Sequence, residues 1–106
     1  MLPKKNRADR KAVEKIFKEG KFINSQNLTL KFIKSDSAVP QISFIVPKSV
    51  AKLAVKRNYL RRLGYSVLEK HLKELPPITG AFVFKKYQDD ISILENEIKN
   101  IFNKLN

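Results

Sequence analysis

This chain of 106 residues contains no cysteine, three glycines and one histidine. Without cysteine it has no disulfide framework, no thiolate metal site and no cysteine nucleophile, and a reducing cytoplasm is the compartment that fits it best. Three glycines are too few for a glycine-rich phosphate loop. The apolar runs are short and no hydrophobic segment follows the basic N-terminus, so we expect neither a signal peptide nor a membrane span.

Residues with the chemistry of an active site are also scarce. His71 has no second histidine or cysteine with which to form a metal site, so a capping or buried role is favoured over catalysis. Asp89 and Asp90 precede the last apolar periodicity and are expected to cap a helix rather than to bind a metal. No Ser/His/Asp set has supporting context. We therefore expect no catalytic residue and no metal ligand in this chain.

Acidic residues are rare in the first part of the chain, where the positive charge is concentrated. The 22 Lys/Arg and 10 Asp/Glu give a net charge of +12. Residues 1–62 hold 16 Lys/Arg against 4 acids, a difference of +12, whereas residues 63–106 hold six of each. A charge that served only solubility would be spread along the chain, so one side is expected to face a polyanion, with nucleic acid as the leading partner. An anionic membrane would require an exposed apolar helix face, and the core needs those residues.

Apolar periodicity predicts a single α+β domain over residues 1–106, with a flexible basic arm at 1–8. The expected helices lie at 9–19, about 54–75 and 91 to the C-terminus, and the expected strands at 22–23, 28–34, 41–47 and 81–87. The order αβββαβα contains a long strand–helix–strand passage, which predicts a parallel crossover in a mixed four-stranded sheet. Helices packed on this sheet form a two-layer sandwich. The second and third strands are predicted to pair as a hairpin.

The stretch VKRNYLRRLGY, residues 55–65, contains no acid, and none lies between Asp36 and Glu69. Helical spacing places apolar positions, among them Leu60 and Val67, on or near one face of the expected helix, and places Asn58, Arg61, Arg62 and Tyr65 together on another. A solvated helix face would carry interleaved glutamates, so polyanion binding is favoured over the solvated alternative. Arginine suits this role because its planar fork can bond two phosphate oxygens. Asn58 offers a donor and an acceptor to a base or sugar, and a helix N-terminal cap stays open as its alternative role.

Two phenylalanines and a lysine pair are further candidates. Phe17 and Phe32 lie beside lysines and are candidates for stacking on unpaired bases, with a place in the core as the alternative. Lys85 and Lys86 follow an apolar strand segment. Because side chains alternate along a strand, at most one of this pair can join a cleft on a given face, and a strand end that emerges into water is the alternative.

Three passages, VPKSVAKLAVKRNYLRRL, KKNRADRKAVEKIFKEG and GAFVFKK, resemble the bacterial ribonuclease P protein component over nearly the whole chain. The resemblance implies a small basic cytoplasmic protein, one per RNA, that helps the catalytic ribonuclease P RNA remove the 5′ leader from precursor tRNA. It also implies that Mg²⁺ and the hydrolysis belong to the RNA. The alternative is a structural RNA-binding protein of ribosomal or chaperone type. An unaided nuclease is disfavoured because clustered carboxylates and histidines are missing.

The same resemblance assigns roles to individual residues. Those implied to contact the catalytic RNA are Lys52, Lys56, Arg57, Asn58, Arg61 and Arg62. Those implied to line the cleft for the single-stranded leader are Phe17, Lys31, Phe32, Lys48, Lys85 and Lys86. Tyr59 departs from the family pattern by replacing the second arginine of an Arg-Asn-Arg signature, and Val13 and Lys31 stand where aromatic residues are common. Leader binding is therefore expected to depend more on charge than on stacking and to be steeply salt-dependent.

Overall fold

The computed structural model describes residues 6, 8–34 and 39–105. The helices and strands of this part follow the predicted order αβββαβα, with one 3₁₀ turn after the second helix. The elements are α1 (Arg10–Glu19), β1 (Lys21–Asn24), β2 (Leu28–Lys34), β3 (Gln41–Ile45), α2 (Ala54–Lys70), the 3₁₀ turn η2 (Leu72–Glu74), β4 (Ile78–Phe84) and α3 (Ile91–Leu105). The predicted α+β class is confirmed. None of the helices in the described part of the chain is long and apolar enough to cross a membrane.

Strand β4 lies inside the mixed sheet, whose strand order is β1-β2-β4-β3. It pairs antiparallel with β2 and parallel with β3, so the predicted parallel crossover through α2 is confirmed. The predicted hairpin between β2 and β3 is wrong, because β4 separates these two strands. Six of the seven residues of β4 are buried. A strand that lacks a polar face is most stable in the interior of a sheet, which explains why β4 takes this position.

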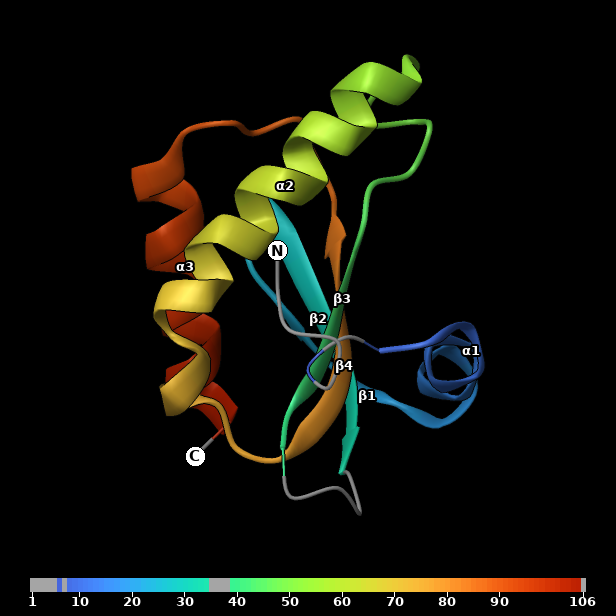
Figure 1. Ribbon diagram of the computed structural model, residues 1–106, viewed down its shortest axis with the longest axis vertical. Helices are drawn as coiled ribbons and strands as arrows, with labels where there is room; N and C mark the ends of the chain where they lie inside the picture. The colour runs from blue at the N-terminus through green and yellow to red at the C-terminus, as the bar shows by residue number, and fades with distance from the viewer. Residues whose placement is uncertain (1–5, 7, 35–38, 106) are drawn as a thin grey trace.

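The sheet separates two groups of helices (Figure 1). On one face, α2 and α3 cover the main core, where Phe82 of β4 stacks on Phe44 of β3 and also meets Phe102 of α3. On the opposite face, α1 packs against β2 and β4, and its Ile16 is buried. Since α1 is short, part of the second face stays open beside it and forms a cleft.

Helix α2 packs tightly against Phe44 of β3 at Gly64. A Cβ atom at this position would lie 2.6 Å from ring atoms of Phe44. The Phe44 ring is itself confined by Phe82, stacked at a centroid distance of 5.1 Å, and by the edge-on ring of Tyr65 at 4.9 Å. The apolar side of α2 is therefore locked against β3, and this contact determines where the opposite, cationic side of the helix stands.

Two element boundaries differ from the prediction. Helix α2 ends at Lys70 rather than at residue 75, because the chain turns at His71 and continues as η2. Strand β4 begins at Ile78 rather than at residue 81, and it ends at Phe84, before the lysine pair. The strand pairs along its whole length with β2, from Lys34↔Ile78 to Leu28↔Phe84. The bounds of β4 thus depend on a partner strand that is distant in the sequence.

Most of the predicted arm, residues 1–5 and 7, lies outside the described residues. Asn6 is buried, and its side-chain amide donates a hydrogen bond to the carbonyl oxygen of Pro40 at 2.9 Å. The Ala8 amide donates to the Ile42 carbonyl oxygen at 3.3 Å. At these two positions the chain is held against the start of β3, because its polar groups satisfy backbone carbonyls there, and it is not a free arm.

Candidate nucleic-acid interface

The cationic side of α2 forms a cleft of about 500 Å³. Its lining residues are Asn58, Arg61, Arg62 and Tyr65, the four that helical spacing predicted to lie together. The opposite side of the helix is buried through Leu60, Gly64, Val67 and Leu68. No carboxylate stands among the described residues that line this cleft. An anion that entered it would meet arginine and amide groups without a competing negative charge.

Two of the side chains that line this cleft, Asn58 and Arg61, are paired with each other. An Arg61 guanidinium nitrogen donates to the side-chain oxygen of Asn58. Since α2 begins at Ala54 with Leu53 at the N-cap position, the alternative role of Asn58 as a helix cap is wrong. The hydrogen bond uses the acceptor of Asn58 and orients the guanidinium of Arg61, so that its remaining N–H groups can face a ligand.

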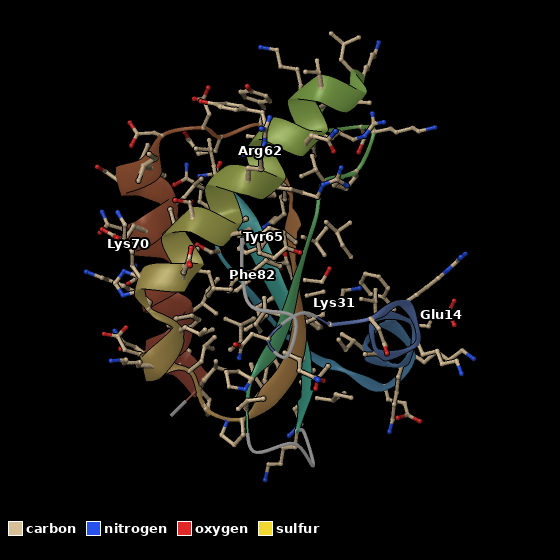
Figure 2. All side chains as sticks on the ribbon, in the orientation of Figure 1. Glu14, Lys31, Arg62, Tyr65, Lys70 and Phe82 are labelled. Atoms are coloured by element: carbon tan, nitrogen blue, oxygen red, sulfur yellow. The ribbon has the colours of Figure 1, made fainter. Side chains whose placement is uncertain are left out.

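Tyr65 connects this cleft to the sheet. Its hydroxyl oxygen accepts a hydrogen bond from the backbone N–H of Phe44 at 3.1 Å. Because β3 is an edge strand, this N–H is directed away from the ladder and would otherwise lack a protein acceptor. Figure 2 shows Tyr65 and Arg62 on α2, and Lys31 on the opposite side of the sheet, next to α1. The cationic cleft and the residues around Lys31 therefore occupy different faces.

Arg57 has a structural role that the sequence did not indicate. One of its guanidinium nitrogens, Nη1, donates to the backbone carbonyl oxygen of Ala51 at 3.0 Å and to that of Lys52 at 2.7 Å. The side chain thus fastens the connection between β3 and α2 to the first turns of the helix. Lys48, Lys52 and Lys56 are exposed on this connection and on α2. Arg57 therefore helps to determine where these three lysines stand.

A second cleft, of about 360 Å³, lies beside α1 on the open face of the sheet. Its lining residues are Phe17, Phe22, Asn24, Thr29, Lys31 and Val83. The Phe17 side chain is 46% exposed, and the Lys31 ammonium lies 4.8 Å from the centre of its ring, within the range of a cation–π contact. The structure brings these two predicted residues together, and it adds Phe22, an aromatic residue that the sequence reasoning missed.

Phe32, which was predicted for the same cleft, lies on the other face of β2. Side chains alternate along a strand, so Phe32 shares its face with Leu28 and Leu30 and packs against the main core. The placement of Phe32 in the cleft with Phe17 is therefore wrong. The strand carries Lys31 toward α1 and Phe32 toward α2 and α3.

The three remaining lysines of the predicted leader cleft do not line it. Lys48 is exposed before α2, and Lys85 and Lys86 are exposed after β4. The Lys85 ammonium donates to the carbonyl oxygen of Ser25 at 3.0 Å, and its backbone N–H donates to the carbonyl oxygen of Asn27 at 2.8 Å. The turn between β1 and β2 thus positions Lys85.

Glu97 anchors this turn from α3, a role for which the sequence offers no signal. The side chain is 8% exposed. It accepts hydrogen bonds from the Ser25 hydroxyl at 2.6 Å, the Asn27 backbone N–H at 2.7 Å and the Asn27 side-chain amide at 2.7 Å. Burial alone would raise the pKa of Glu97, but the hydrogen bonds from Ser25 and Asn27 outweigh it and hold the pKa below its usual value.

His71 joins the end of α2 to α3. Its side chain is 12% exposed, with Nδ1 3.1 Å from a carboxylate oxygen of Glu74 and Nε2 3.0 Å from one of Glu95. The hydrogen bond with His71 lowers the pKa of Glu95. These contacts agree with the structural role expected for His71.

Asp90 caps α3, as predicted. Its carboxylate accepts a hydrogen bond from the Ile93 backbone N–H at 3.2 Å. Over residues 6, 8–34 and 39–105, no three His, Asp or Glu side chains gather as metal ligands would.

These features define a class: a small basic α+β protein with two anion-compatible clefts on different faces of one mixed sheet. Comparisons with known proteins agree on one family within this class. A family model described as Ribonuclease P matches residues 2–106. The ribonuclease P protein component of Borreliella afzelii is 31% identical over 94 residues, which cover 88% of this chain and 85% of the relative. That of Vesicomyosocius okutanii is 29% identical over 93 residues, which cover 85% and 80%.

Solved structures show the same fold. The RNase P protein from Thermotoga maritima matches with a TM-score of 0.79 at 18% identity, over 88% of this chain and 90% of that one. A Staphylococcus aureus RNase P protein mutant with defective mRNA degradation activity matches with a TM-score of 0.83 at 14% identity, over 96% and 89%. The chain belongs to the ribonuclease P protein family. Membership assigns it to the tRNA-processing protein subunits of this endoribonuclease and implies the ribonuclease P RNA as its partner.

Proposed function

We propose that this protein binds the ribonuclease P RNA through the cationic cleft of α2 and binds the single-stranded 5′ leader of precursor tRNA in the cleft beside α1. The observation that supports this division is the placement of Arg61 and Arg62 on one face of the sheet and of Phe17 and Lys31 on the other. Two faces allow one protein to contact two RNA molecules at the same time. The protein thereby holds the substrate next to the RNA that cleaves it.

The cleft of α2 has the chemistry to hold a structured RNA. Arginine forks bond phosphate oxygens in pairs, and such contacts provide most of the affinity of proteins for nucleic acid backbones. The Asn58 amide pairs with Arg61, and Tyr65 is hydrogen-bonded to β3, so the cleft is largely organised before RNA arrives. A preorganised site loses less side-chain entropy on binding. Arg57 supports this surface indirectly, because it holds the connection that carries Lys48 and Lys52.

The cleft beside α1 has the chemistry to hold a single strand. Unpaired bases stack on exposed aromatic rings without regard to sequence, and a nearby ammonium attracts the backbone. Phe17 and Phe22 are 46% and 63% exposed in this cleft, and Lys31 stands beside them. Phe22 supplies a second ring that compensates for the aromatic residues missing at Val13 and Lys31. We therefore assign the cleft both stacking and charge, rather than charge with little stacking.

The Mg²⁺ required for hydrolysis belongs, in this proposal, to the RNA. Mg²⁺ takes oxygen ligands in octahedral geometry, and phosphates of a folded RNA can supply them. The protein's contribution is to bind and orient the leader, and to reduce the repulsion between the phosphates of the substrate and those of the RNA.

Cleavage of precursor tRNA tests the proposal. A 5′-leader precursor tRNA is incubated at low Mg²⁺ with a matched ribonuclease P RNA alone, with the protein alone, and with both. We expect the correct 5′ end to form quickly only in the combined reaction. Cleavage by protein alone would assign the chemistry to this chain. Tight binding to the RNA without stimulation would instead favour a structural RNA-binding protein.

Variants separate the two clefts. Phe17→Ala is expected to lower the affinity of the assembled holoenzyme for precursor tRNA while leaving its affinity for leaderless tRNA unchanged. The paired change Arg61→Ala with Arg62→Ala is expected to weaken assembly with the RNA and to lower the log–log salt slope by about 0.7 to 0.9 for each lost phosphate contact. Lys104→Ala is the matched control, because Lys104 is an exposed cation in the last turn of α3. Equal effects of all three changes would contradict the assignment of separate clefts.

A further inference from the structure

A third cleft, of about 490 Å³, lies between the first turns of α2 and the connection from β4 to α3. Its lining residues are Val55, Lys56, Tyr59, Arg62, Tyr87 and Asp89. Val55, Tyr59 and Arg62 follow one another at i, i+4 and i+7, so they share one side of the helix. Tyr87 and Asp89 come from the connection on the other side. The cleft thus has walls from two elements that the sequence separates widely.

Two tyrosines dominate this cleft. Tyr59 and Tyr87 are each 41% exposed, one from each wall. The Tyr87 hydroxyl lies 3.5 Å from a carboxylate oxygen of Asp89 on the same connection, a weak contact that satisfies the hydroxyl locally. A large, rigid ring that stays accessible to solvent is a binding surface for a flat apolar partner. The two rings offer such a partner contacts from both walls.

Charge around the tyrosines favours an anionic partner on one side of the cleft. Lys56 and Arg62 stand on the α2 wall, and Asp89 stands on the opposite wall. A phosphate would be attracted toward α2 and repelled from Asp89. Arg62 also lines the cleft with Asn58, Arg61 and Tyr65, so the two clefts share this side chain. An RNA strand bound along α2 can therefore continue from one cleft into the other.

We propose that this cleft accepts an unpaired nucleobase of the ribonuclease P RNA, stacked on Tyr59 and Tyr87, while Arg62 and Lys56 bond the adjoining phosphate. This inference rests on the proposed function of α2 as the RNA-binding element. A nucleobase combines the two properties that the cleft selects, a flat apolar face and an attached anion. The tyrosine at position 59 thereby exchanges a phosphate contact for a stacking contact. A stacked base also explains why two aromatic rings are left exposed beside cations.

Stacking and phosphate contacts have different salt signatures, which makes the proposal testable. A stacked base releases no counterions, so its loss lowers affinity at every salt concentration by a similar factor. We expect Tyr59→Leu and Tyr87→Leu each to weaken binding of the ribonuclease P RNA about 5- to 100-fold at an unchanged log–log salt slope. Lys56→Ala is expected to lower the slope by about 0.7 to 0.9. Tyr59→Phe keeps the ring and should bind as the wild type does.

The decisive experiment combines binding with crosslinking. Affinity for the ribonuclease P RNA is measured at several salt concentrations for the wild type, the tyrosine variants and Phe22→Leu, an exposed aromatic control from the cleft beside α1. The RNA is then transcribed with 5-iodouridine and irradiated in the complex. Crosslinks that appear at unpaired nucleotides with the wild type and disappear in Tyr59→Leu or Tyr87→Leu would support the proposal. Circular dichroism establishes that each variant is folded.

Each of the following results would overturn the inference. Tyrosine-to-leucine variants that bind like the wild type would show that the cleft takes no part in RNA binding. A loss of affinity accompanied by a lower salt slope would assign the effect to displaced cations rather than to stacking. Failure of the wild type to bind the RNA at all, together with no stimulation of cleavage, would remove the proposed function and this inference with it. Normal stimulation with unaffected tyrosine variants would remove the inference alone.

Discussion

Replacing Glu97 tests how α3 positions the turn that carries the contacts of Lys85. The carboxylate accepts three hydrogen bonds, one from Ser25 and two from Asn27. Glu97→Leu removes every acceptor and leaves both donors of the buried Asn27 without a partner. Glu97→Gln keeps the shape, but it replaces one acceptor oxygen by an NH₂ group that opposes the side-chain amide of Asn27. The two variants therefore remove different parts of one network.

The expected loss in free energy of unfolding follows from the number of hydrogen-bond donors left unpaired. A buried donor without a partner costs about 1–3 kcal/mol, and the two donors of Asn27 together with the half-buried Ser25 hydroxyl make a loss of about 3–5 kcal/mol for Glu97→Leu. Glu97→Gln disturbs one contact and should cost about 1–2 kcal/mol. Small domains have a total stability of about 5–15 kcal/mol. The glutamine variant is therefore the better one for equilibrium unfolding.

The stabilisation that Glu97 provides is expected to decrease at low pH. Because the folded pKa of Glu97 is lower than its usual value, its stabilisation is fully present above the ordinary glutamate pKa of about 4.3. It is lost as the pH falls through the lower folded pKa. The difference in free energy of unfolding between the wild type and Glu97→Gln should be constant near neutral pH and should shrink below about pH 4. Other carboxylates, including Glu95, titrate in both proteins and cancel in this difference.

Urea unfolding followed by circular dichroism measures these quantities from pH 7 down to pH 3. Glu14→Gln is the matched control, because the Glu14 carboxylate is exposed on α1 and lies 3.8 Å from Arg10, a surface pair expected to contribute less than about 1 kcal/mol. Glu97→Gln as stable as the wild type at pH 7 would refute the reasoning. A difference that persists undiminished at pH 3 would refute the assignment to the ionised carboxylate.

Three further substitutions test the packing of α2. Gly64→Ala should lower the free energy of unfolding by about 1–3 kcal/mol, because the confined Phe44 ring has to move. This loss should exceed the gain from the better helix propensity of alanine, and a higher urea midpoint would contradict the prediction. Arg57→Met keeps the apolar stem but removes the guanidinium that bridges both loop carbonyls, so stability should fall by about 1 kcal/mol. The salt slope of RNA binding should stay the same although a charge is lost, and a lower slope would indicate a direct phosphate contact. Tyr65→Phe should cost about 1–2 kcal/mol in urea unfolding, because the Phe44 N–H loses its acceptor; an unchanged midpoint would mean that water replaces the hydroxyl.

Local patterns predicted the elements that are most regular. Helical spacing placed Asn58, Arg61, Arg62 and Tyr65 on one side of α2, and the structure lines a cleft with them. The neighbouring apolar positions, among them Leu60, predicted the buried side equally well. These predictions succeeded because helical periodicity depends only on residues within a few turns of each other. The predicted cap of α3 at Asp90 is local in the same sense.

The predictions failed where contacts between residues distant in the sequence decide the structure. The pairing of β2 depends on whether β3 or β4 is the better neighbour, and the apolar β4 takes the position beside it. Phe32 was predicted for the cleft because it follows a lysine in the sequence. Its ring instead packs against the main core, because the core lies on the face of β2 to which Phe32 points. Glu97 and Phe22 gained their roles from contacts across the fold that no short stretch of sequence contains.

The amino-acid sequence by itself determined that this protein is a basic α+β domain and that α2 carries cations on one side. Charge, composition and periodicity are properties of the chain, whatever it touches. The tertiary structure alone decided that Phe17, Phe22 and Lys31 share a cleft, that Tyr59 and Tyr87 line another, and that Arg57 holds the connection before α2. These arrangements depend on strand order and helix placement, which result from the free energy of the whole packed core rather than from any local preference.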